Sequence, residues 1–457
     1  MSRHYSGGPV TSLALRAIQS QDREQMSGET DESGSTIRDP TSRDGSVKER
    51  KSMRIAYVMS RFPKLTETFI LYEILELERL GFDVSVYPLM RERESVVHPE
   101  AERLVERAHY LPFFSLAILR TQLRFLVRRP VAYLRALAAL AAGTFGSRNY
   151  FFGGLAVFPK VAHAARLMAD EGVTHVHCHF SSHPAAAGFI IHRLTSIPYT
   201  FTAHGSDLHR DRHMLCRKTM EAAGVVTISE YNKELIVEEC GEAQRDKVVV
   251  IRCGADTGVF HPPSRERDSA DPFALLCVAS LREVKGQTYL IEACRRLLEE
   301  GVELVCRLVG DGPYRARLER QIAKAGVGSQ ILMLGRKTRG EVADLLRKTD
   351  VCVAPSVWTQ QGDREGIPVA LMEAMSCGVA VVASNISGIP ELVEHERTGL
   401  LVEPGDVAGI ADALRRLRAD SLLRARLAAA GRSKVLAEYD LRTNAGALAR
   451  FIGELSV

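Results

Sequence analysis

The chain lacks several features that would assign it to a membrane, extracellular or nucleic-acid-binding class. No run reaches the roughly 20 apolar residues of a membrane-spanning helix, and the first fifty residues lack the apolar stretch of a secretory signal. Nine cysteines are scattered without a CxxC pair, which favours reduced core thiols in a cytoplasmic protein. The net charge of +4, with 25% charged residues, is too balanced to indicate a nucleic-acid binder.

What is present indicates two globular domains that follow a tail. Residues 1–52 are rich in Ser, Gly, Asp, Glu and Arg and have few large apolar side chains, so we expect them to be disordered. A chain of 457 residues with 46% hydrophobic residues can bury two ordinary cores. A polar, proline-rich stretch from His261 to Pro272 separates two series of predicted strands.

Strands alternate with helices in both series. The first series of strands is predicted at 53–59, 82–87, 173–179, 199–203 and 224–229. The second is predicted at 273–279, 303–309, 331–334 and 351–355. Such alternation is typical of parallel sheets. We therefore predict an α/β fold of two doubly wound Rossmann-like domains that face a cleft at the carboxyl ends of their strands.

The most informative stretch runs from Glu365 to Gly378 and places two glutamates around a helix start. Pro368 suits the first helical position, and Gly378 suits the residue just past the end. The unpaired N–H groups at that N-terminus form an anion site that fits a diphosphate. With a rise of about 1.5 Å per residue, Glu373 lies roughly 7 Å beyond Pro368, a layout that suits a nucleotide sugar. The alternative is an ordinary amphipathic helix with two solvated glutamates.

This stretch, together with Ser384–Val393 and Thr398–Asp406, resembles the donor domain of family 4 glycosyltransferases. The resemblance covers about residues 53–440. Within this family, the chain is similar to bacterial exopolysaccharide enzymes of the colanic-acid type. It implies the glycosyltransferase B fold. The domains it implies are an acceptor-side domain at 53–262, a donor-binding domain at 263–438 and a final helix at 439–457 that crosses back to the first domain.

The resemblance assigns diphosphate binding to the loop Val278–Gly286. Lys285 matches the family's lysine, whereas Ser280 stands where the family has an arginine, and Arg282 lies two residues further on. Cations at such a site stabilise charge that develops in the transition state. The alternative is a solvated basic turn.

His204 follows a predicted strand and resembles the family histidine that lies against the donor sugar. On its own, a histidine there is more often structural; with Lys285 and Glu365 it forms the set of expected catalytic residues. Glu365 would hold sugar hydroxyls and Glu373 the ribose. The other donor-binding residues that the resemblance implies are Ser280, Arg282, Gly312, Gly366, Ile367, Pro368 and Val369.

The first strand-to-helix loop is a candidate for the acceptor side of the site. Arg61 and Glu67 are the residues to which we assign this role. The alternative is that the loop only caps the following helix, through Thr66 or Thr68.

We expect no metal. Three histidines alternate along one predicted strand, at His175, His177 and His179, and His183 follows it. No carboxylate or cysteine with metal spacing accompanies them in the sequence. No DxD-type carboxylate pair stands at a loop where it could hold Mg²⁺ against a diphosphate. We therefore expect no cofactor, and the nucleoside diphosphate sugar is a co-substrate.

Residues 107–166 contain no acidic residue but many arginines. Arg120, Arg124 and Arg128 stack at helical spacing, and Leu116, Leu119, Leu123 and Leu126 line another face. Basic amphipathic helices of this kind lie on anionic membrane surfaces, so we expect peripheral contact with the inner face of the plasma membrane. The alternative is a helix packed on the first domain with its arginines solvated.

The residues and the resemblance together predict a retaining glycosyltransferase of hexosyltransferase type. It would move a sugar from a nucleoside diphosphate sugar to a saccharide or lipid-linked acceptor in cell-surface polysaccharide synthesis. The rival functions are a sugar-nucleotide epimerase of the same fold and a protein that binds nucleotide sugars without transferring them. The missing arginine at Ser280 keeps the second rival open.

Overall fold

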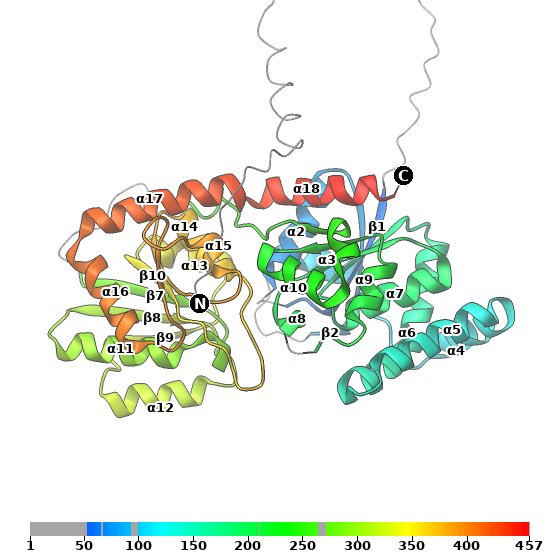
Figure 1. The fold of residues 1–457 in the computed structure, drawn as a ribbon, viewed down its shortest axis with the longest axis horizontal. Coiled ribbons are helices and arrows are strands. Elements are labelled where there is room, and N and C mark those ends of the chain that lie inside the picture. Colours follow the sequence, from blue (N-terminus) through cyan, green and yellow to red (C-terminus); the bar gives the residue numbers. More distant parts are fainter. Residues whose placement is uncertain (1–52, 65–66, 93–98, 210, 264–270, 457) are drawn as a thin grey trace, which may run out of the picture. The chain divides into compact units, whose positions relative to one another are not determined.

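The computed structural model describes residues 53–64, 67–92, 99–209, 211–263 and 271–456. The predicted tail, 1–52, and the middle of the predicted linker lie outside these residues. Two six-stranded sheets form the centres of the two halves (Figure 1). Every pairing within them is parallel.

The first sheet has the order β2-β1-β3-β4-β5-β6. Its strands are β1 (Arg54–Phe62), β2 (Asp83–Arg91), β3 (His175–His179), β4 (Tyr199–Ala203), β5 (Gly224–Thr227) and β6 (Val248–Val250). All residues of β3, β4 and β5 are buried. Burial without alternation is expected for parallel strands that helices cover on both faces.

The second sheet has the order β12-β11-β10-β7-β8-β9. Its strands are β7 (Phe273–Val278), β8 (Leu304–Val309), β9 (Ile331–Gly335), β10 (Val351–Ala354), β11 (Ala380–Ser384) and β12 (Leu400–Val402). Both sheets continue outward in two directions from a central strand, which is the doubly wound topology. The predicted fold class is therefore confirmed.

Helices cover both sheets. In the first half they are α2 (Thr68–Arg79), α3 (Glu102–Arg107), α4 (Leu116–Arg128), α5 (Pro130–Thr144), α6 (Arg148–Asp170), α7 (His183–Thr195), α8 (Ser206–His209), α9 (Leu215–Glu221) and α10 (Glu230–Cys240). In the second half they are α11 (Gln287–Glu299), α12 (Arg315–Ala325), α13 (Arg339–Leu346), α14 (Val369–Ser376), α15 (Ile389–Leu392), α16 (Val407–Ala419) and α17 (Ser421–Glu438). The last helix along the chain is α18 (Leu441–Glu454). Short 3₁₀ helices are η1 (Pro99–Ala101), η2 (Glu242–Lys247) and η3 (Glu283–Lys285).

The last helix, α18, packs on the first half rather than on the second (Figure 1). Leu448 and Ile452 of α18 are buried in the same apolar cluster as Ile70 and Ile74 of α2. The chain turns toward the first half at Asp440, which caps α18 by accepting a hydrogen bond from the N–H of Thr443 at 2.9 Å.

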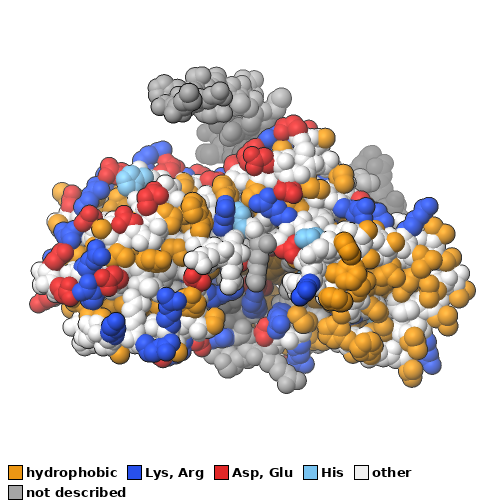
Figure 2. Space-filling model, turned by 60° about the horizontal axis from the view of Figure 1, so that its bottom comes forward, with side chains coloured by type: hydrophobic (Ala, Val, Ile, Leu, Met, Phe, Trp, Pro, Cys, Tyr) orange, Lys and Arg blue, Asp and Glu red, His pale blue; other side chains and the backbone are white. Residues whose placement is uncertain are grey.

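Helix α4 buries a narrow face and leaves a wide apolar face exposed. Ile118, Thr121 and Phe125 are buried at helical spacing. The leucines at 116, 119, 123 and 126 are instead exposed by 72%, 65%, 62% and 42%. Apolar side chains gather over the end of the molecule that carries α4 and α5, on the right of Figure 2. The described residues therefore leave the leucine face largely uncovered.

The nine cysteines are all free thiols, and six of them are buried. Among the described residues, no helix is long and apolar enough to cross a membrane.

Candidate functional site

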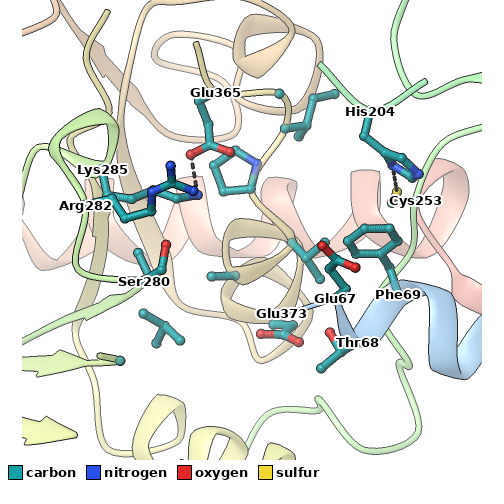
Figure 3. A pocket seen from close by; sticks show the side chains of 18 of the residues that line it. Glu67, Thr68, Phe69, His204, Cys253, Ser280, Arg282, Lys285, Glu365 and Glu373 are labelled. Carbon is teal, nitrogen blue, oxygen red and sulfur yellow. Dashed lines mark hydrogen bonds and ion pairs between the residues drawn. The ribbon is translucent and has the colours of Figure 1, made fainter. Parts of the chain in front are cut away.

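A cleft of about 380 Å³ lies where the strands of both sheets end. Its walls come from segments that follow β1, β3, β4, β5 and β6 of the first sheet and β7, β8, β9 and β10 of the second. Figure 3 shows side chains from both halves pointing into it. It brings together most of the predicted site residues: Glu67, His204, Ser280, Arg282, Lys285, Glu365, Gly366, Ile367, Pro368, Val369 and Glu373.

Two glycines let the halves touch at this cleft. A Cβ on Gly366 would lie 2.3 Å from the carbonyl oxygen of His204, and a Cβ on Gly205 would lie 3.0 Å from the Cα of Gly366. Gly205 also has a φ of +127°, which other residues rarely adopt. The pairs His204-Gly205 and Glu365-Gly366 therefore place a histidine and a glutamate at one backbone contact between the two halves.

An ion pair joins two of the residues that we expected to be catalytic. The Lys285 ammonium contacts the Glu365 carboxylate, and the two side chains are 22% and 14% exposed. Gly286 holds this loop in place, because a Cβ there would lie 1.8 Å from the carbonyl oxygen of Pro355. Arg282 lines the cleft from the residue before η3. Ser280 supplies no charge, so Arg282 and Lys285 are the cations of this loop.

The helix after Glu365 starts one residue later than predicted. Pro368, with φ −64° and ψ 122°, is the N-cap of α14, and Val369 is the first helical residue. No side chain caps this end, and residues 366–370 line the cleft. The first N–H groups of α14 therefore lie at the cleft wall, which is the arrangement that anions favour.

Glu373 lies in the second turn of α14 and faces the same cleft (Figure 3). Burial raises the pKa of this carboxyl to about 7, although the positive charge of Arg339 acts in the opposite direction. Arg339 already forms an ion pair with Asp256 at 2.8 Å and lies over the ring of Tyr72. Glu373 is thus a carboxylate whose charge the protein alone does not fully compensate.

His204 is buried at the opposite wall. Its ring contacts the rings of Phe69 and Phe180, with centroid separations of 4.6 and 4.9 Å. The turn that carries it is fixed by Asp207, whose Oδ1 accepts hydrogen bonds from the N–H groups of His204 and Gly205 at 3.0 and 2.9 Å. Burial, and then the neighbouring His179, lower the pKa of His204 to about 3. The imidazole is therefore neutral near pH 7.

Two predicted residues, Arg61 and Gly312, do not line the cleft. Arg61 forms an ion pair with Glu92 at 3.2 Å, and its side chain is 45% exposed. Gly312 packs against backbone, because a Cβ there would lie 2.5 Å from the carbonyl oxygen of Leu281. The residues of that loop that do line the cleft are Gly310 and Asp311.

The acceptor-side loop also differs from the capping alternative. Glu67 lines the cleft and pairs with Lys64. Burial raises the pKa of Glu67, and Lys64 acts in the opposite direction. Thr68 is the first residue of α2 rather than its cap, and the N-cap, Glu67, makes no capping hydrogen bond through its side chain. Thr66 lies outside the described residues.

Sequence reasoning missed a run of cations after β9. Arg336, Lys337 and Arg339 all line the cleft. Arg336 pairs with Asp311 at 3.9 Å, and Lys337 pairs with Glu341 at 2.8 Å. Arg339 forms the ion pair with Asp256 described above. The signal was the basic sequence directly after a predicted strand, at the sheet edge where ligands bind. Arg364, just before Glu365, also lines the cleft.

The expectation that no carboxylate accompanies the strand histidines is wrong. Each of Glu73, His177 and His179 offers one atom that could bind a metal ion, and these three atoms lie within 4.8 Å of one another. Glu73 stands on α2, about a hundred residues before the histidines, so local spacing could not reveal it. The ring nitrogens of both histidines are already hydrogen-bonded within the protein.

Comparisons with known proteins agree with this arrangement. The family model described as "Glycosyl transferases group 1" matches residues 263–434, and that of "Glycosyltransferase Family 4" matches residues 133–259. An Escherichia coli (strain K12) protein, named as the colanic acid biosynthesis glycosyltransferase WcaL, is 32% identical over 379 residues. That match covers 79% of this chain and 90% of the relative. The chain belongs to the family 4 glycosyltransferases.

Two further comparisons cover nearly the whole of the proteins concerned. The amylovoran biosynthesis glycosyltransferase AmsK of Erwinia amylovora is 28% identical over 407 residues, which is 85% of this glycosyltransferase and 96% of AmsK. The crystal structure of Anabaena Alr3699/HepE in complex with UDP-glucose superposes with a TM-score of 0.66 at 18% identity. It covers 88% of this chain and 100% of that one. This second likeness shows that the fold is shared.

Proposed function

We propose that this glycosyltransferase moves a sugar, with retention, from a nucleoside diphosphate sugar to a saccharide acceptor in cell-surface polysaccharide synthesis. The observation that carries the proposal is the convergence of Lys285, Glu365, His204 and the start of α14 on one cleft. The relatives named for colanic acid and amylovoran biosynthesis support the polysaccharide. The HepE complex with UDP-glucose supports the donor class.

Each side chain has a role that its chemistry suits. Lys285 and Arg282 bind the diphosphate and stabilise the charge that develops on it as it leaves. Glu365 accepts hydrogen bonds from sugar hydroxyls, Glu373 accepts them from the ribose, and His204 lies beside the reacting carbon. Because Lys285 and Glu365 neutralise each other in the structure, donor binding exchanges this ion pair for contacts of each residue with the substrate.

The leaving diphosphate helps to deprotonate the incoming hydroxyl on the same face of the sugar, so no protein nucleophile is needed. No metal is needed either, because the cleft already presents several cations. They are Arg282, Lys285, Arg336, Lys337, Arg339 and Arg364. Together with the N-terminus of α14 they supply the positive charge that Mg²⁺ supplies at other diphosphate sites.

The acceptor is lipid-linked in this proposal, and α4 holds the enzyme at the membrane surface. The exposed leucine face of α4 lies beside the exposed side chains of Arg120, Arg124 and Arg128. An apolar face of this kind enters the boundary between headgroups and acyl chains, while arginines bind anionic lipids. The exposure of these leucines favours this role over packing on the domain.

One experiment separates the transferase from its rivals. The purified chain is incubated with a panel of labelled nucleoside diphosphate sugars, with and without lipid-linked acceptors. A transferase releases nucleoside diphosphate and labels the acceptor only when both substrates are present. An epimerase releases nucleotide without an acceptor, and a binding protein releases none. Labelled donor that never reaches any acceptor would contradict the proposal.

A further inference from the structure

A buried chain of hydrogen bonds runs from α2 to His204. Glu73 Oε1 lies 2.9 Å from Nε2 of His179, and Nδ1 of His179 lies 3.0 Å from Nε2 of His204. His179 is fully buried and His204 is 9% exposed. His179 is the last residue of β3, and His204 comes directly after β4, the neighbouring strand. The chain therefore connects a carboxylate behind the sheet edge to the imidazole at the cleft.

Tyr57 sets the direction of this chain. Its hydroxyl donates a hydrogen bond to the same Glu73 Oε1, at 2.7 Å, and burial raises the pKa of the phenol so that it stays a donor. An ionised Glu73 offers only acceptor oxygens, so Oε1 accepts one hydrogen bond from Tyr57 and one from Nε2–H of His179. Burial raises the pKa of Glu73, and a proton on Oε1 would instead be donated to Nε2 of His179. With Glu73 ionised, His179 carries its proton on Nε2.

The tautomer of His204 follows from that of His179. A neutral imidazole with its proton on Nε2 has a lone pair on Nδ1, so His179 accepts a hydrogen bond there. The donor is Nε2–H of His204, which leaves a lone pair on Nδ1 of His204. The Cys253 thiol lies 3.9 Å from that atom (Figure 3). Burial raises the pKa of this thiol, so it stays protonated and is itself a donor.

We propose that Glu73 and His179 are positioning residues that hold His204 in the tautomer with a free Nδ1, so that it accepts a hydrogen bond from a sugar hydroxyl in the cleft. The identity of the hydroxyl rests on the proposed function. The tautomer does not, because it follows from the hydrogen bonds that an ionised Glu73 accepts. Cys253 and His204 both line the cleft, so a substrate hydroxyl replaces the weak thiol donor.

Two other observations agree with this assignment. Burial lowers the pKa of His179 and of His204 to about 3, so both rings stay neutral near pH 7 and each carries a single proton. The remaining strand histidines belong to a separate set of hydrogen bonds: His175 and His177 both contact the hydroxyl of Thr200. His175 is therefore a matched control, since it is equally buried on the same strand but is not bonded to His204.

The tautomer is tested directly by ¹⁵N NMR of protein labelled at histidine, without any substrate. The His204 signals are assigned by their loss in His204→Asn. We expect Nε2 of His204 to show a protonated, pyrrole-type shift and Nδ1 an unprotonated, pyridine-type shift. Glu73→Gln keeps an acceptor oxygen and should keep this pattern, whereas Glu73→Met should give a mixture of tautomers. A proton on Nδ1 of His204 in the parent protein would overturn the proposal whether or not any variant folds.

The hydroxyl is tested with deoxy analogues of the donor and of the acceptor, each lacking one hydroxyl. In the parent, the analogue that lacks the partner of Nδ1 should react with a kcat/KM about tenfold lower, the effect of one hydrogen bond. In Glu73→Met, kcat/KM for the natural substrates should already be lower by this factor. The same analogue should then lower kcat/KM of this variant little further. Glu73→Gln should restore most of the rate, and His175→Gln should resemble the parent.

The outcomes distinguish this inference from the proposed function. If the parent transfers no sugar from any donor, the proposed function fails while the NMR result still decides the tautomer. If transfer proceeds but Glu73→Met retains both the His204 tautomer and the parent kcat/KM, the positioning role is refuted. Loss of rate in Glu73→Met and His175→Gln alike would show a general packing effect and would also refute it.

Discussion

The substitution Glu373→Gln should stabilise the protein and weaken donor binding at the same time. The carboxyl has a folded-state pKa of about 7, against an ordinary value of 4.5, and the first cause is burial. Because the unfolded chain releases this proton at lower pH than the folded chain, ionisation favours unfolding. The free-energy cost of the ionised carboxyl to the folded state is absent below pH 4.5, grows between pH 4.5 and 7, and is constant above pH 7.

The magnitude follows from this difference. Each tenfold change in proton affinity corresponds to about 1.4 kcal/mol, so the ionised carboxyl costs the folded state about 3 kcal/mol at pH 8 and under about 1 kcal/mol at pH 5. Glutamine has nearly the same shape and carries no charge. The free energy of unfolding of Glu373→Gln should therefore exceed that of the parent, and the excess should be larger at pH 8.

Urea unfolding at pH 5 and pH 8, followed by circular dichroism, measures this excess. Glu319→Gln is the control, since Glu319 is an exposed glutamate outside the cleft. Donor binding by the same variant should fall about ten- to a hundredfold at pH 8, because a charge-assisted hydrogen bond to the ribose is lost. A variant that is less stable than the parent at pH 8, or an excess that does not change with pH, would refute the reasoning about burial.

The remaining predictions concern the cations and the membrane. Arg282→Ala should lower kcat about as much as Lys285→Ala, ten- to a hundredfold, and the double variant should lose less than the product of the two, because both act on one diphosphate. A parent-like rate in Arg282→Ala would leave the charge to Lys285 and the helix. A chelator should leave the transfer rate unchanged, and abolition by chelator would contradict the metal-free mechanism. The enzyme should sediment with anionic vesicles, and reversing Arg120, Arg124 and Arg128 to Glu should remove at least about 3 kcal/mol of binding while transfer to a soluble acceptor continues. Equal vesicle binding by this variant would refute the membrane role.

Much of the fold could be predicted because local pattern decides it. The strand at 199–203 has the predicted bounds, since its aromatic and β-branched residues favour a strand. The start of α14 differed by a single residue, because Pro368 has an extended ψ of 122° and serves as the cap. Helix ends commonly shift by this much.

The candidate site was predictable only where residues follow strands in recognisable motifs. His204, Lys285 and Glu365 meet because all three stand in loops at the sheet edges that face the cleft. Glu73 could not be found in this way. It lies in the middle of α2, and only the pairing of β1 with β3 brings that helix to the histidines. A contact between distant elements leaves no periodic trace in the sequence.

Misplaced residues have equally specific causes. Gly310 lines the cleft and Gly312 does not, although a Cβ on either glycine would meet backbone atoms. Arg61 is the eighth residue of β1, and its side chain turns to Glu92. Sequence indicates the loop in which a residue lies, whereas the direction of its side chain depends on the neighbouring strand.

The most direct test of the central claim is the rate of sugar transfer by Glu365→Ala, measured beside Glu319→Ala. Glu365 stands at the contact between the halves and pairs with Lys285, so the transfer site in this cleft depends on it. We predict a kcat about ten- to a hundredfold lower for Glu365→Ala, with unchanged circular dichroism, and a parent-like rate for Glu319→Ala. A parent-like rate in Glu365→Ala would contradict the assignment of this cleft as the site of transfer.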